Sequence, residues 1–586
     1  MYQMNRIEGT ILSNKERAIL LGLTLLIFII HVRHLGSLGI ITVLDDEFGY
    51  WGNAAYLAGL DWSGIVSKIP YYSYGYSLLL VPLFFIFDRP DYIYKSAIVL
   101  NGVMLSASFL LCFDIALKLA KGFDKKMLMG TAFLIFMYPA YIAYSNIAYT
   151  ECLLIFIIWL LSWCFTDLSN KSRNFKFVLI GFLTMYLYMV HQRALGVLIA
   201  SICVIIVMNV LGRINLRKVL LVFLPMIILF LVHVYLKDYI QTQLWLNNSG
   251  NLTNDYLAQA SKISQIFQGD GFIALIKASL GHVFYIGAAS YLLGYFGIYE
   301  LLTKIVKAVV ATVRNRKLEI LSCDHYFPLY AFLLIAVLFS LAINIIFMIN
   351  PFRMDQIVYG RYIDMIMGPL ILLGFISLIN NESNQNRVFW MISIGFIPLT
   401  IAVKLIIDVS GLTFFSILDA VGLLLITYPF SVFLPAITAI LACRLMLISF
   451  VKKDSRLIII SFIMVSLCFF VTGDNVARTT AVGNQTTTEL IDAVKYIENG
   501  MMPVYFLWDD QEKSIYRKIA DCYQFLLKDI PVKLVNKTEL EAIDEKAFVL
   551  TPFNYKYLSD VNRDYEYCMD NQYTYLFVSK TSGLCE

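Results

Sequence analysis

Long apolar runs are the feature that most constrains the fold of this chain. They recur at residues 18–33, 72–87, 95–118, 127–145, 152–166, 177–190, 194–212, 219–236, 283–303, 327–349, 365–380, 388–406, 430–450 and 456–472. About 20 apolar residues in a helix cross the hydrocarbon core of a bilayer. Because 59% of the residues are hydrophobic and only 15% are charged, a soluble domain could not bury this surface. The sequence predicts an all-α polytopic membrane bundle.

Clusters of Lys and Arg between the apolar runs predict the topology, because positively charged loops stay in the cytoplasm. The clusters lie at residues 15–17, 121–126, 171–176, 213–218, 304–317 and 452–456. They predict about thirteen crossings, a cytoplasmic N-terminus and a tail outside the cytoplasm. One apolar run must then fail to cross, unless the cluster at 121–126 breaks the rule. We expect run 72–87 to be re-entrant or interfacial, because residues 71–76 resemble an aromatic belt.

The composition changes after residue 473. Helix-like segments at 488–498 and 511–527 alternate with strand-like segments at 503–508, 532–535, 548–551 and 573–579. Such alternation predicts a small α/β domain. We therefore divide the chain into a transmembrane domain, 1–473, and an extracytoplasmic domain, 474–586. The second domain has no Gly-rich phosphate loop, so we expect it to dock an acceptor or to stabilise the protein.

Three carboxylates, Asp45, Asp46 and Glu47, directly follow the first apolar run, in the predicted first outward loop, 34–71. Charges beside a span cost free energy in lipid and need a watery cleft or a function. If the segment is helical, Asp46 and Tyr50 lie one turn apart on one face. A carboxylate there could act as a general base toward a hydroxyl. The structural alternative is a helix N-cap with a favourable dipole interaction.

This order of features resembles the GT-C glycosyltransferase superfamily. A first span, the pattern Asp-Glu-x-x-Tyr, an amphipathic stretch, and Lys68 near Pro70 before the next apolar run are similar to protein O-mannosyltransferases and to the aminoarabinose transferases that modify lipid A. The resemblance implies that Asp46 is the catalytic base and Glu47 its neighbour. It also implies that Tyr50 and Lys68 lie near the phosphate of a lipid-linked donor. Those families often have two prolines and an acid before the lysine, which this chain lacks.

Two further positions agree with the family pattern in the first half of the chain. Glu151 follows a proline and a serine, as in the second outward loop of the family, and charge parity puts it on the side of Asp46. Arg193, in the sequence His-Gln-Arg, breaks the apolar stretch 177–212, and the resemblance implies that it contacts phosphate. The alternatives are a helix-start acid for Glu151 and an ordinary interhelical loop around Arg193.

The pair Arg361 and Tyr362, before the apolar run 365–380, is similar to an Arg-Tyr pair of the family. Arg361 could bind a phosphate through two hydrogen bonds, which a lysine cannot imitate. The alternative is an arginine that snorkels at the membrane boundary. Arg353 and His282 are weaker candidates.

The resemblance implies transfer of a sugar from a polyprenyl-phosphate-linked donor to an acceptor hydroxyl on the outer face, by one displacement with inversion. Lys68, Arg193 and Arg361 would stabilise the departing phosphate. One rival is a flippase or exporter of lipid-linked saccharides, whose charges would lie near the midplane. Another is a polysaccharide polymerase or ligase built around the long outward loop 237–282.

The sequence leaves several properties of the predicted enzyme open. The adjacent Asp46 and Glu47 could hold a divalent metal ion, so the metal requirement stays open. Neither the sugar nor the acceptor, which could be a glycan, a lipid or a protein, follows from the residues. The net charge of +4 is too small to indicate nucleic-acid binding. Low Ala with abundant Ile, Asn and Lys is typical of an AT-rich bacterial genome, so we expect a bacterial plasma membrane.

Overall fold

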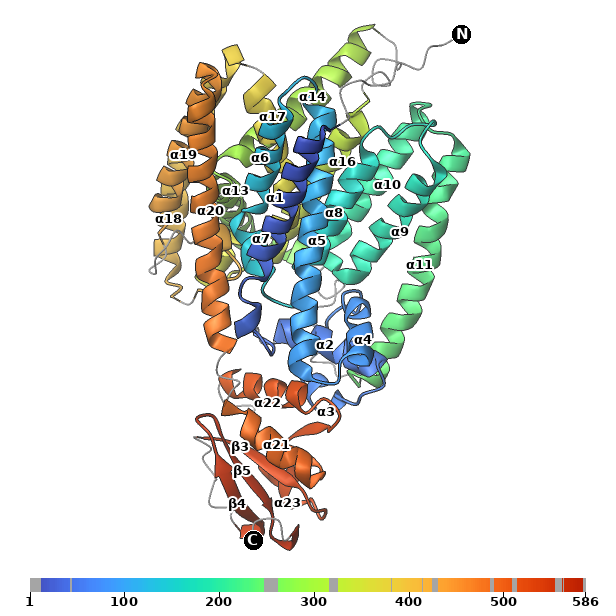
Figure 1. The fold of residues 1–586 in the computed structure, drawn as a ribbon, viewed down its shortest axis with the longest axis vertical. Coiled ribbons are helices and arrows are strands. Elements are labelled where there is room, and N and C mark those ends of the chain that lie inside the picture. The colour runs from blue at the N-terminus through green and yellow to red at the C-terminus, as the bar shows by residue number, and fades with distance from the viewer. Residues whose placement is uncertain are drawn as a thin grey trace.

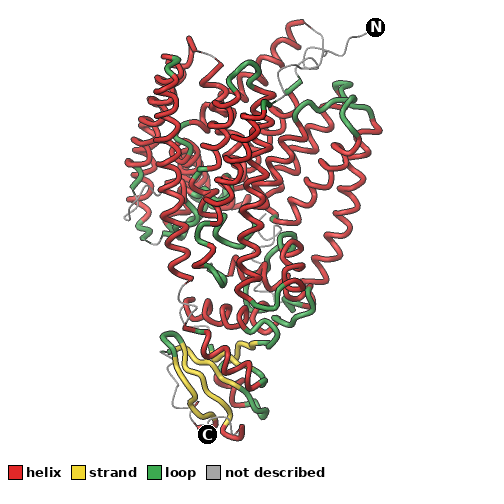
Figure 2. Tube along the Cα trace, viewed as in Figure 1, coloured by secondary structure: helices red, strands yellow, loops and turns green. Residues whose placement is uncertain are grey.

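The computed structural model has a helical bundle and a small β-sheet domain at one end of it (Figures 1 and 2). It describes residues 12–42, 45–246, 262–315, 325–380, 382–413, 415–423, 431–484, 489–508, 514–553, 561 and 563–582. Helix α1 begins at the end of the bundle opposite the sheet (Figure 1).

The bundle is built from helices of very different lengths. They are α1 (Asn14–Val32), α2 (Asp45–Leu57), α3 (Ser63–Val66), α4 (Ser77–Ile86), α5 (Pro90–Leu119), α6 (Lys125–Phe136), α7 (Pro139–Tyr144), α8 (Glu151–Phe165), α9 (Asn174–Val190), α10 (Leu195–Val210), α11 (Leu216–Gln243), α13 (Gly271–Ala289), α14 (Leu293–Asn315), α16 (Phe327–Phe347), α17 (Asp364–Asn380), α18 (Glu382–Ser410), α19 (Phe433–Lys452) and α20 (Ser455–Asn484). Short 3₁₀ helices are η1 (Leu35–Ser37), η2 (Gln192–Ala194), η4 (Met354–Val358) and η5 (Val421–Leu423).

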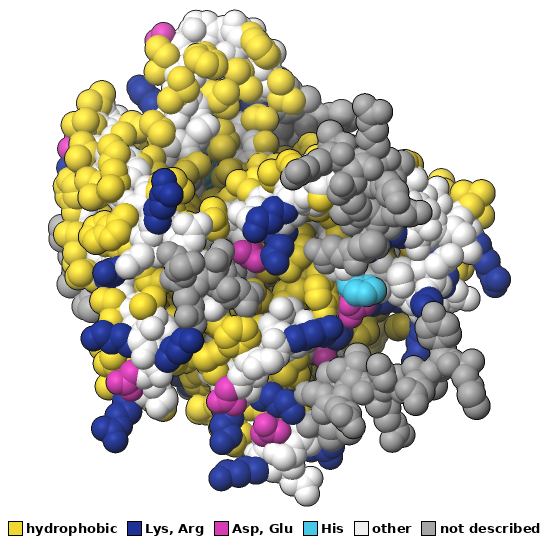
Figure 3. Space-filling view, turned by 90° about the horizontal axis from the view of Figure 1, so that it is seen from above, with side chains coloured by type: hydrophobic (Ala, Val, Ile, Leu, Met, Phe, Trp, Pro, Cys, Tyr) yellow, Lys and Arg dark blue, Asp and Glu magenta, His cyan; other side chains and the backbone are white. Residues whose placement is uncertain are grey.

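Within the described residues, 9 helices are long and apolar enough to cross a membrane. They include α1, α5 and α16, and further apolar helices such as α8 and α9 are shorter. The membrane bundle predicted from the apolar runs is therefore confirmed, while the count of about thirteen crossings stays a prediction. Figure 3 views the end of the bundle opposite the sheet domain, where Lys and Arg side chains are spread over the surface. The positive-inside rule predicts this end to be cytoplasmic.

The run at 72–87 forms a helix that is too short to span a bilayer. Helix α4 has 10 residues and therefore rises about 15 Å, roughly half the thickness of the hydrocarbon core. It lies beside α2, at the end of the bundle that carries the sheet domain (Figure 1). This length agrees with the expectation of a re-entrant or interfacial segment.

Helices α14 and α17 pack closely because glycines face the opposite backbone. A Cβ atom on Gly297 would lie 2.1 Å from the carbonyl oxygen of Leu370, and one on Gly374 would lie 2.1 Å from that of Leu293. Small residues commonly allow such close approach between membrane helices. This contact helps to fix α17, which begins three residues after Arg361.

The C-terminal domain is a sheet of 5 strands in the order β2-β1-β3-β5-β4. The strands are β1 (Val504–Leu507), β2 (Val532–Val535), β3 (Phe548–Pro552), β4 (Tyr565–Asp570) and β5 (Thr574–Ser579), with helices α21 (Ile491–Gly500), α22 (Ser514–Leu526), α23 (Lys537–Glu541) and the 3₁₀ helix η7 (Lys580–Ser582). Strand β1 pairs in parallel with β2 and β3, whereas β5 pairs antiparallel with β3 and β4. The predicted small α/β domain is confirmed. Only β4 has no counterpart among the predicted strands.

The C-terminal domain contacts the segment that follows the first span. Helices α2 and α3 lie between the bundle and the sheet domain (Figure 1). The indole Nε1 of Trp62 donates to the carbonyl oxygen of Lys528 at 2.9 Å. A Cβ atom on Gly64 would lie 2.7 Å from the carbonyl oxygen of Val532. The predicted catalytic loop is thus fixed on one side by the domain.

Candidate active site

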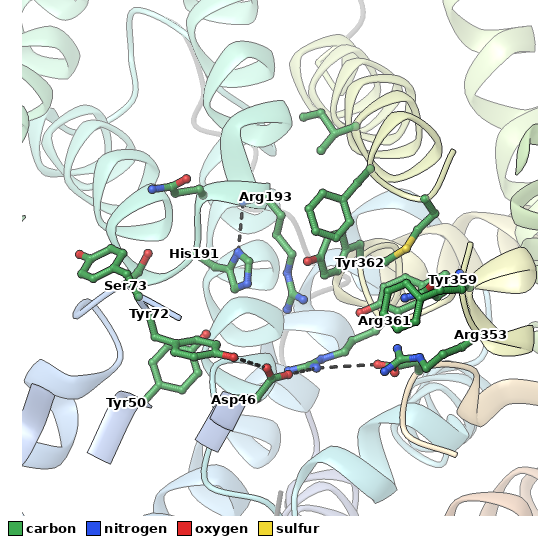
Figure 4. Close-up of a pocket in the computed structure, with 18 residues that line it drawn as sticks. Asp46, Tyr50, Tyr72, Ser73, His191, Arg193, Arg353, Tyr359, Arg361 and Tyr362 are labelled. Carbon is green, nitrogen blue, oxygen red and sulfur yellow. Dashed lines mark hydrogen bonds and ion pairs between the residues drawn. The ribbon is translucent and has the colours of Figure 1, made fainter. Parts of the chain in front are cut away.

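A cavity of about 520 Å³ opens at the end of the bundle that carries α2. Its lining comes from segments that are far apart in the sequence: the start of α2, the chain before α4, the turn between α9 and η2, the end of α16 and the segment before α17 (Figure 4). The polar lining residues are Asp46, Tyr50, Tyr71, Tyr72, Ser73, His191, Gln192, Arg193, Arg353, Gln356, Tyr359, Arg361, Tyr362 and Asp419.

Asp46 is a partly accessible carboxylate of this cavity, with 36% of its side chain exposed. Its Oδ1 accepts a hydrogen bond from the hydroxyl of Tyr72 at 2.7 Å, and its Oδ2 accepts one from Nη1 of Arg361. Burial by itself would raise the pKa of Asp46, but the guanidinium of Arg361 and the hydroxyl of Tyr72 lower it below its ordinary value. Asp46 is therefore ionised at neutral pH.

A buried ion cluster lies beside Asp46. Oε1 of Glu151 accepts hydrogen bonds from Nη2 of Arg193, at 2.8 Å, and from Nε of Arg361. The side chains of Glu151 and Arg193 are each 2% exposed. Within the described part of the chain, Nε and Nη1 of Arg193 are buried without a hydrogen-bond partner. Buried donors are normally satisfied, so Arg193 keeps hydrogen-bonding capacity that Glu151 does not use.

The structure brings most of the predicted site residues together. The cavity is lined by five of them: Asp46, Tyr50, Arg193, Arg361 and Tyr362. Glu151 accepts hydrogen bonds from the two arginines of this set. The ring of Tyr362 supports Arg193, whose guanidinium carbon lies 4.7 Å from the ring centroid. Burial and the nearby carboxylates raise the pKa of Tyr50, so its phenol stays neutral and can donate a hydrogen bond.

Glu47 and Lys68 lie outside the cavity lining. Glu47 is fully buried, and its Oε1 accepts from the hydroxyl of Tyr94 at 2.6 Å and from the backbone N–H of Ala148 at 3.0 Å. It therefore joins α2 to α5 and to the segment before α8, on a different face from Asp46. Lys68 is exposed at the end of α3. His282 is also away from the cavity, buried in α13 with Nδ1 close to the carbonyl oxygen of Ala278.

Sequence reasoning missed several lining residues. Tyr72 lies in the aromatic segment interpreted as a membrane belt, and His191 stands beside Arg193 without having been singled out as a site residue itself. Asp419 gave no motif signal. Its carboxylate accepts from Nη2 of Arg353 at 2.8 Å, and Arg353 also pairs with the buried Asp355 at 3.1 Å. For His191 the available signal was its position next to Arg193, and for Asp419 it was the possibility of an ion pair with an arginine. Neither signal is specific.

The described residues contain no group of three or more His, Cys, Asp or Glu side chains arranged to hold a metal ion. The neighbouring carboxylates Asp46 and Glu47 point to different partners. The metal requirement stays open.

Comparison with known proteins rests on the fold. No family model and no curated protein matches the chain. A crystal structure of ArnT from Cupriavidus metallidurans bound to undecaprenyl phosphate matches with a TM-score of 0.52 and 10% identity, over 98% of this chain and 100% of that one. The apo structure of the same protein matches with a TM-score of 0.50 and 11% identity, over 97% and 98%. At this identity the comparison concerns the fold alone: the membrane bundle with a small C-terminal sheet has an ArnT-like fold.

Proposed function

We propose that the chain is a GT-C glycosyltransferase that moves a sugar from a polyprenyl-phosphate-linked donor to an acceptor hydroxyl on the outer face of the membrane. The observation that carries this proposal is the convergence of one accessible carboxylate, Asp46, with the buried cations Arg193 and Arg361 on one cavity. A base beside fixed positive charge is what displacement of a phosphate leaving group requires. The likeness in fold to ArnT, which binds undecaprenyl phosphate, supports a lipid-phosphate donor.

The ion pair between Asp46 and Arg361 suggests how the donor prepares the site. The donor phosphate can compete with Asp46 for the guanidinium of Arg361, because its two non-bridging oxygens can accept two parallel hydrogen bonds. Donor phosphate would replace Asp46 on Nη1 of Arg361 and would lie beside the guanidinium of Arg193, which lines the same cavity. Asp46 would keep the hydrogen bond from Tyr72 and become free to accept a proton.

The transfer step then follows in one displacement. The acceptor hydroxyl gives its proton to Asp46 as its oxygen attacks the anomeric carbon. The bond between that carbon and the phosphate oxygen breaks, and the electron pair leaves with the polyprenyl phosphate. Attack from the face opposite the leaving group inverts the anomeric centre. Arg193 and Arg361 stabilise the charge that grows on the departing phosphate, an interaction that strengthens where water is excluded.

Glu151 and Glu47 are better suited to positioning than to proton transfer. Glu151 is buried, and its Oε1 already accepts from both arginines. A single carboxylate between two guanidinium groups offsets their repulsion and fixes the distance between them. Glu47 orients the first turn of α2 through Tyr94 and Ala148. Asp46 is thereby left as the proposed base.

The proposal predicts turnover without a sealed compartment. Full-length protein purified in detergent is incubated with a panel of undecaprenyl-phosphate-linked sugars and hydroxyl acceptors, and release of undecaprenyl phosphate is measured. Asp46→Asn should lower turnover by at least about 100-fold, as loss of a general base does, while Asp88→Asn, an exposed aspartate at the same end, serves as the matched control. Asp46→Asn turning over at the wild-type rate would refute the assignment.

The same assay separates the rival functions. A flippase or exporter would release no undecaprenyl phosphate in detergent and would move its substrate only across a sealed membrane. A polymerase or ligase would lengthen a saccharide rather than transfer one sugar. Residues 247–261 of the loop 237–282 that this last hypothesis invokes lie outside the described residues, and the two ends of the range 237–282 belong to α11 and α13.

A further inference from the structure

His191 occupies a distinctive position in the cavity, at the turn between α9 and η2. Its Nδ1 accepts a hydrogen bond from the backbone N–H of Arg193 at 3.2 Å, so the imidazole caps the start of η2. Its ring packs edge-on against Tyr362, with ring centroids 5.8 Å apart and an interplanar angle of 65°. In Figure 4 the ring extends from the turn into the space between Arg193 and Asp46. Backbone and packing together fix its orientation.

The capping hydrogen bond decides which nitrogen carries the proton. A nitrogen that accepts from an N–H group has no proton of its own, and in a neutral imidazole the other nitrogen then carries it. Nε2 of His191 is therefore a donor, and it makes no hydrogen bond to any residue that the structure describes. His191 lines the cavity, so this N–H is available to a bound molecule.

The electrostatic surroundings keep His191 neutral. Burial lowers its pKa, the guanidinium groups of Arg193 and Arg361 lower it further, and the carboxylate of Asp46 offsets only part of this effect, so the pKa lies well below the ordinary value. Protonation would also remove the acceptor at Nδ1 that caps Arg193. A neutral imidazole with its proton on Nε2 can donate a hydrogen bond but cannot take a proton without losing the cap.

We propose that His191 is a catalytic residue of this site that donates its Nε2–H to a non-bridging phosphate oxygen of the donor. The inference rests on the proposed function. Arg193, whose backbone fixes the imidazole, lines the same cavity as His191 and Arg361, so the imidazole donor lies beside the guanidinium groups proposed to bind the phosphate. The oxygen gains negative charge as the bond from phosphate to the sugar breaks, and a fixed neutral donor stabilises that charge without adding a full charge that would retain the product.

Two substitutions separate the roles of the two imidazole nitrogens. In His191→Asn the amide oxygen lies near the position of Nδ1 and can still cap Arg193, but no donor reaches the position of Nε2. In His191→Gln the amide nitrogen reaches the position of Nε2 and restores the donor, while the capping acceptor is lost. If His191 only caps the turn, the Asn variant should keep its transferase activity. If His191 donates to the substrate, the Gln variant should keep it.

The experiment measures kcat, KM and thermal unfolding of the full-length variants in detergent. We expect His191→Asn to lower kcat by about 100-fold, the effect of removing one donor to a developing oxyanion, with an unfolding temperature close to wild type. His191→Gln should retain kcat within about 10-fold. Wild-type kcat in His191→Asn, together with loss of kcat in His191→Gln, would overturn the proposal in favour of a capping role.

Binding of undecaprenyl phosphate gives a readout that does not depend on turnover. The affinity of the full-length protein for this lipid should fall several-fold in His191→Asn and stay near wild type in His191→Gln. Equal affinity in wild type and both variants would refute contact between His191 and phosphate, even if the enzyme proves active. If no donor in the panel is turned over by wild type, the proposed function fails, and the binding result still decides whether His191 contacts the phosphate.

Discussion

Phe525 connects the C-terminal domain to the helix that carries Asp46, and this contact allows a sharp prediction. Its ring, on α22, is 1% exposed. The ring centroid lies 5.2 Å from that of Trp51, on the same helix as Asp46, and 6.1 Å from those of Trp62 and Tyr94. All three pairs are edge-to-face, an arrangement that stabilises aromatic clusters beyond their buried area. The domain therefore holds α2 against the bundle.

Phe525→Ala removes this connection while leaving the cavity residues in place. Truncation of a buried phenylalanine costs about 3–5 kcal/mol, and three aromatic partners place this site in the upper part of that range. Because the lost contacts join the domain to α2, we expect α2 to shift and Asp46 to be displaced with it. A displacement of about 1 Å at a catalytic group lowers the rate on the order of 100-fold. The KM for the donor should change less, because Arg193 and Arg361 belong to other elements.

The assay is release of undecaprenyl phosphate by the full-length protein, analysed for kcat and KM, with thermal unfolding measured in parallel. Phe525→Leu keeps apolar volume in the aromatic cluster and should restore most of the lost kcat. Phe553→Ala is the matched control, because Phe553 stacks on Tyr575 within the domain. A wild-type kcat in Phe525→Ala would refute the idea that the domain positions Asp46.

Three further predictions follow from individual contacts. Arg361→Lys should raise KM for the donor by about 10-fold or more, because lysine cannot bind phosphate through two parallel hydrogen bonds; saturation kinetics test this, and an unchanged KM would contradict it. Glu47→Gln should destabilise the protein by about 1.5–3 kcal/mol, since it weakens hydrogen bonds made to a charged group, and an unfolding temperature equal to wild type would exclude this role. Burial raises the pKa of Asp355 to about 6, so the folded chain binds this proton more tightly than the unfolded chain, and the stability contributed below about pH 4 is lost as pH rises through about 6. Asp355→Asn should remove that part of the pH dependence of thermal unfolding, and a profile identical to wild type would count against it.

Local sequence patterns determined the classes of element in this protein. The apolar runs predicted membrane helices because length and hydropathy are properties of a contiguous segment. In the tail, the strand expected at 532–535 coincides with β2. A short apolar segment between helix-like stretches can be recognised as a strand from its own residues. Strand β4 was missed because Tyr567 and other residues of the strand are polar or exposed, so the hydrophobic pattern is weak.

The candidate site could be predicted only in part. Asp46, Arg193 and Arg361 were found because charge is rare and costly next to a membrane span. The sequence could not distinguish Asp46 from Glu47, since neighbouring residues on a helix point about 100° apart and only the packing of α2 decides which one faces the cavity. Nor could it show that Lys68 lies outside the lining, because the direction of its side chain depends on how α3 packs against β2.

The sequence by itself thus determined a membrane bundle with a small α/β domain and named most of the charged groups that matter. Only the tertiary structure decided that residues 46, 193 and 361 share one cavity and that His191 lines it beside them. The physical reason is that hydropathy and charge are encoded locally, whereas the rotation of each helix is set by contacts with partners far away in the chain.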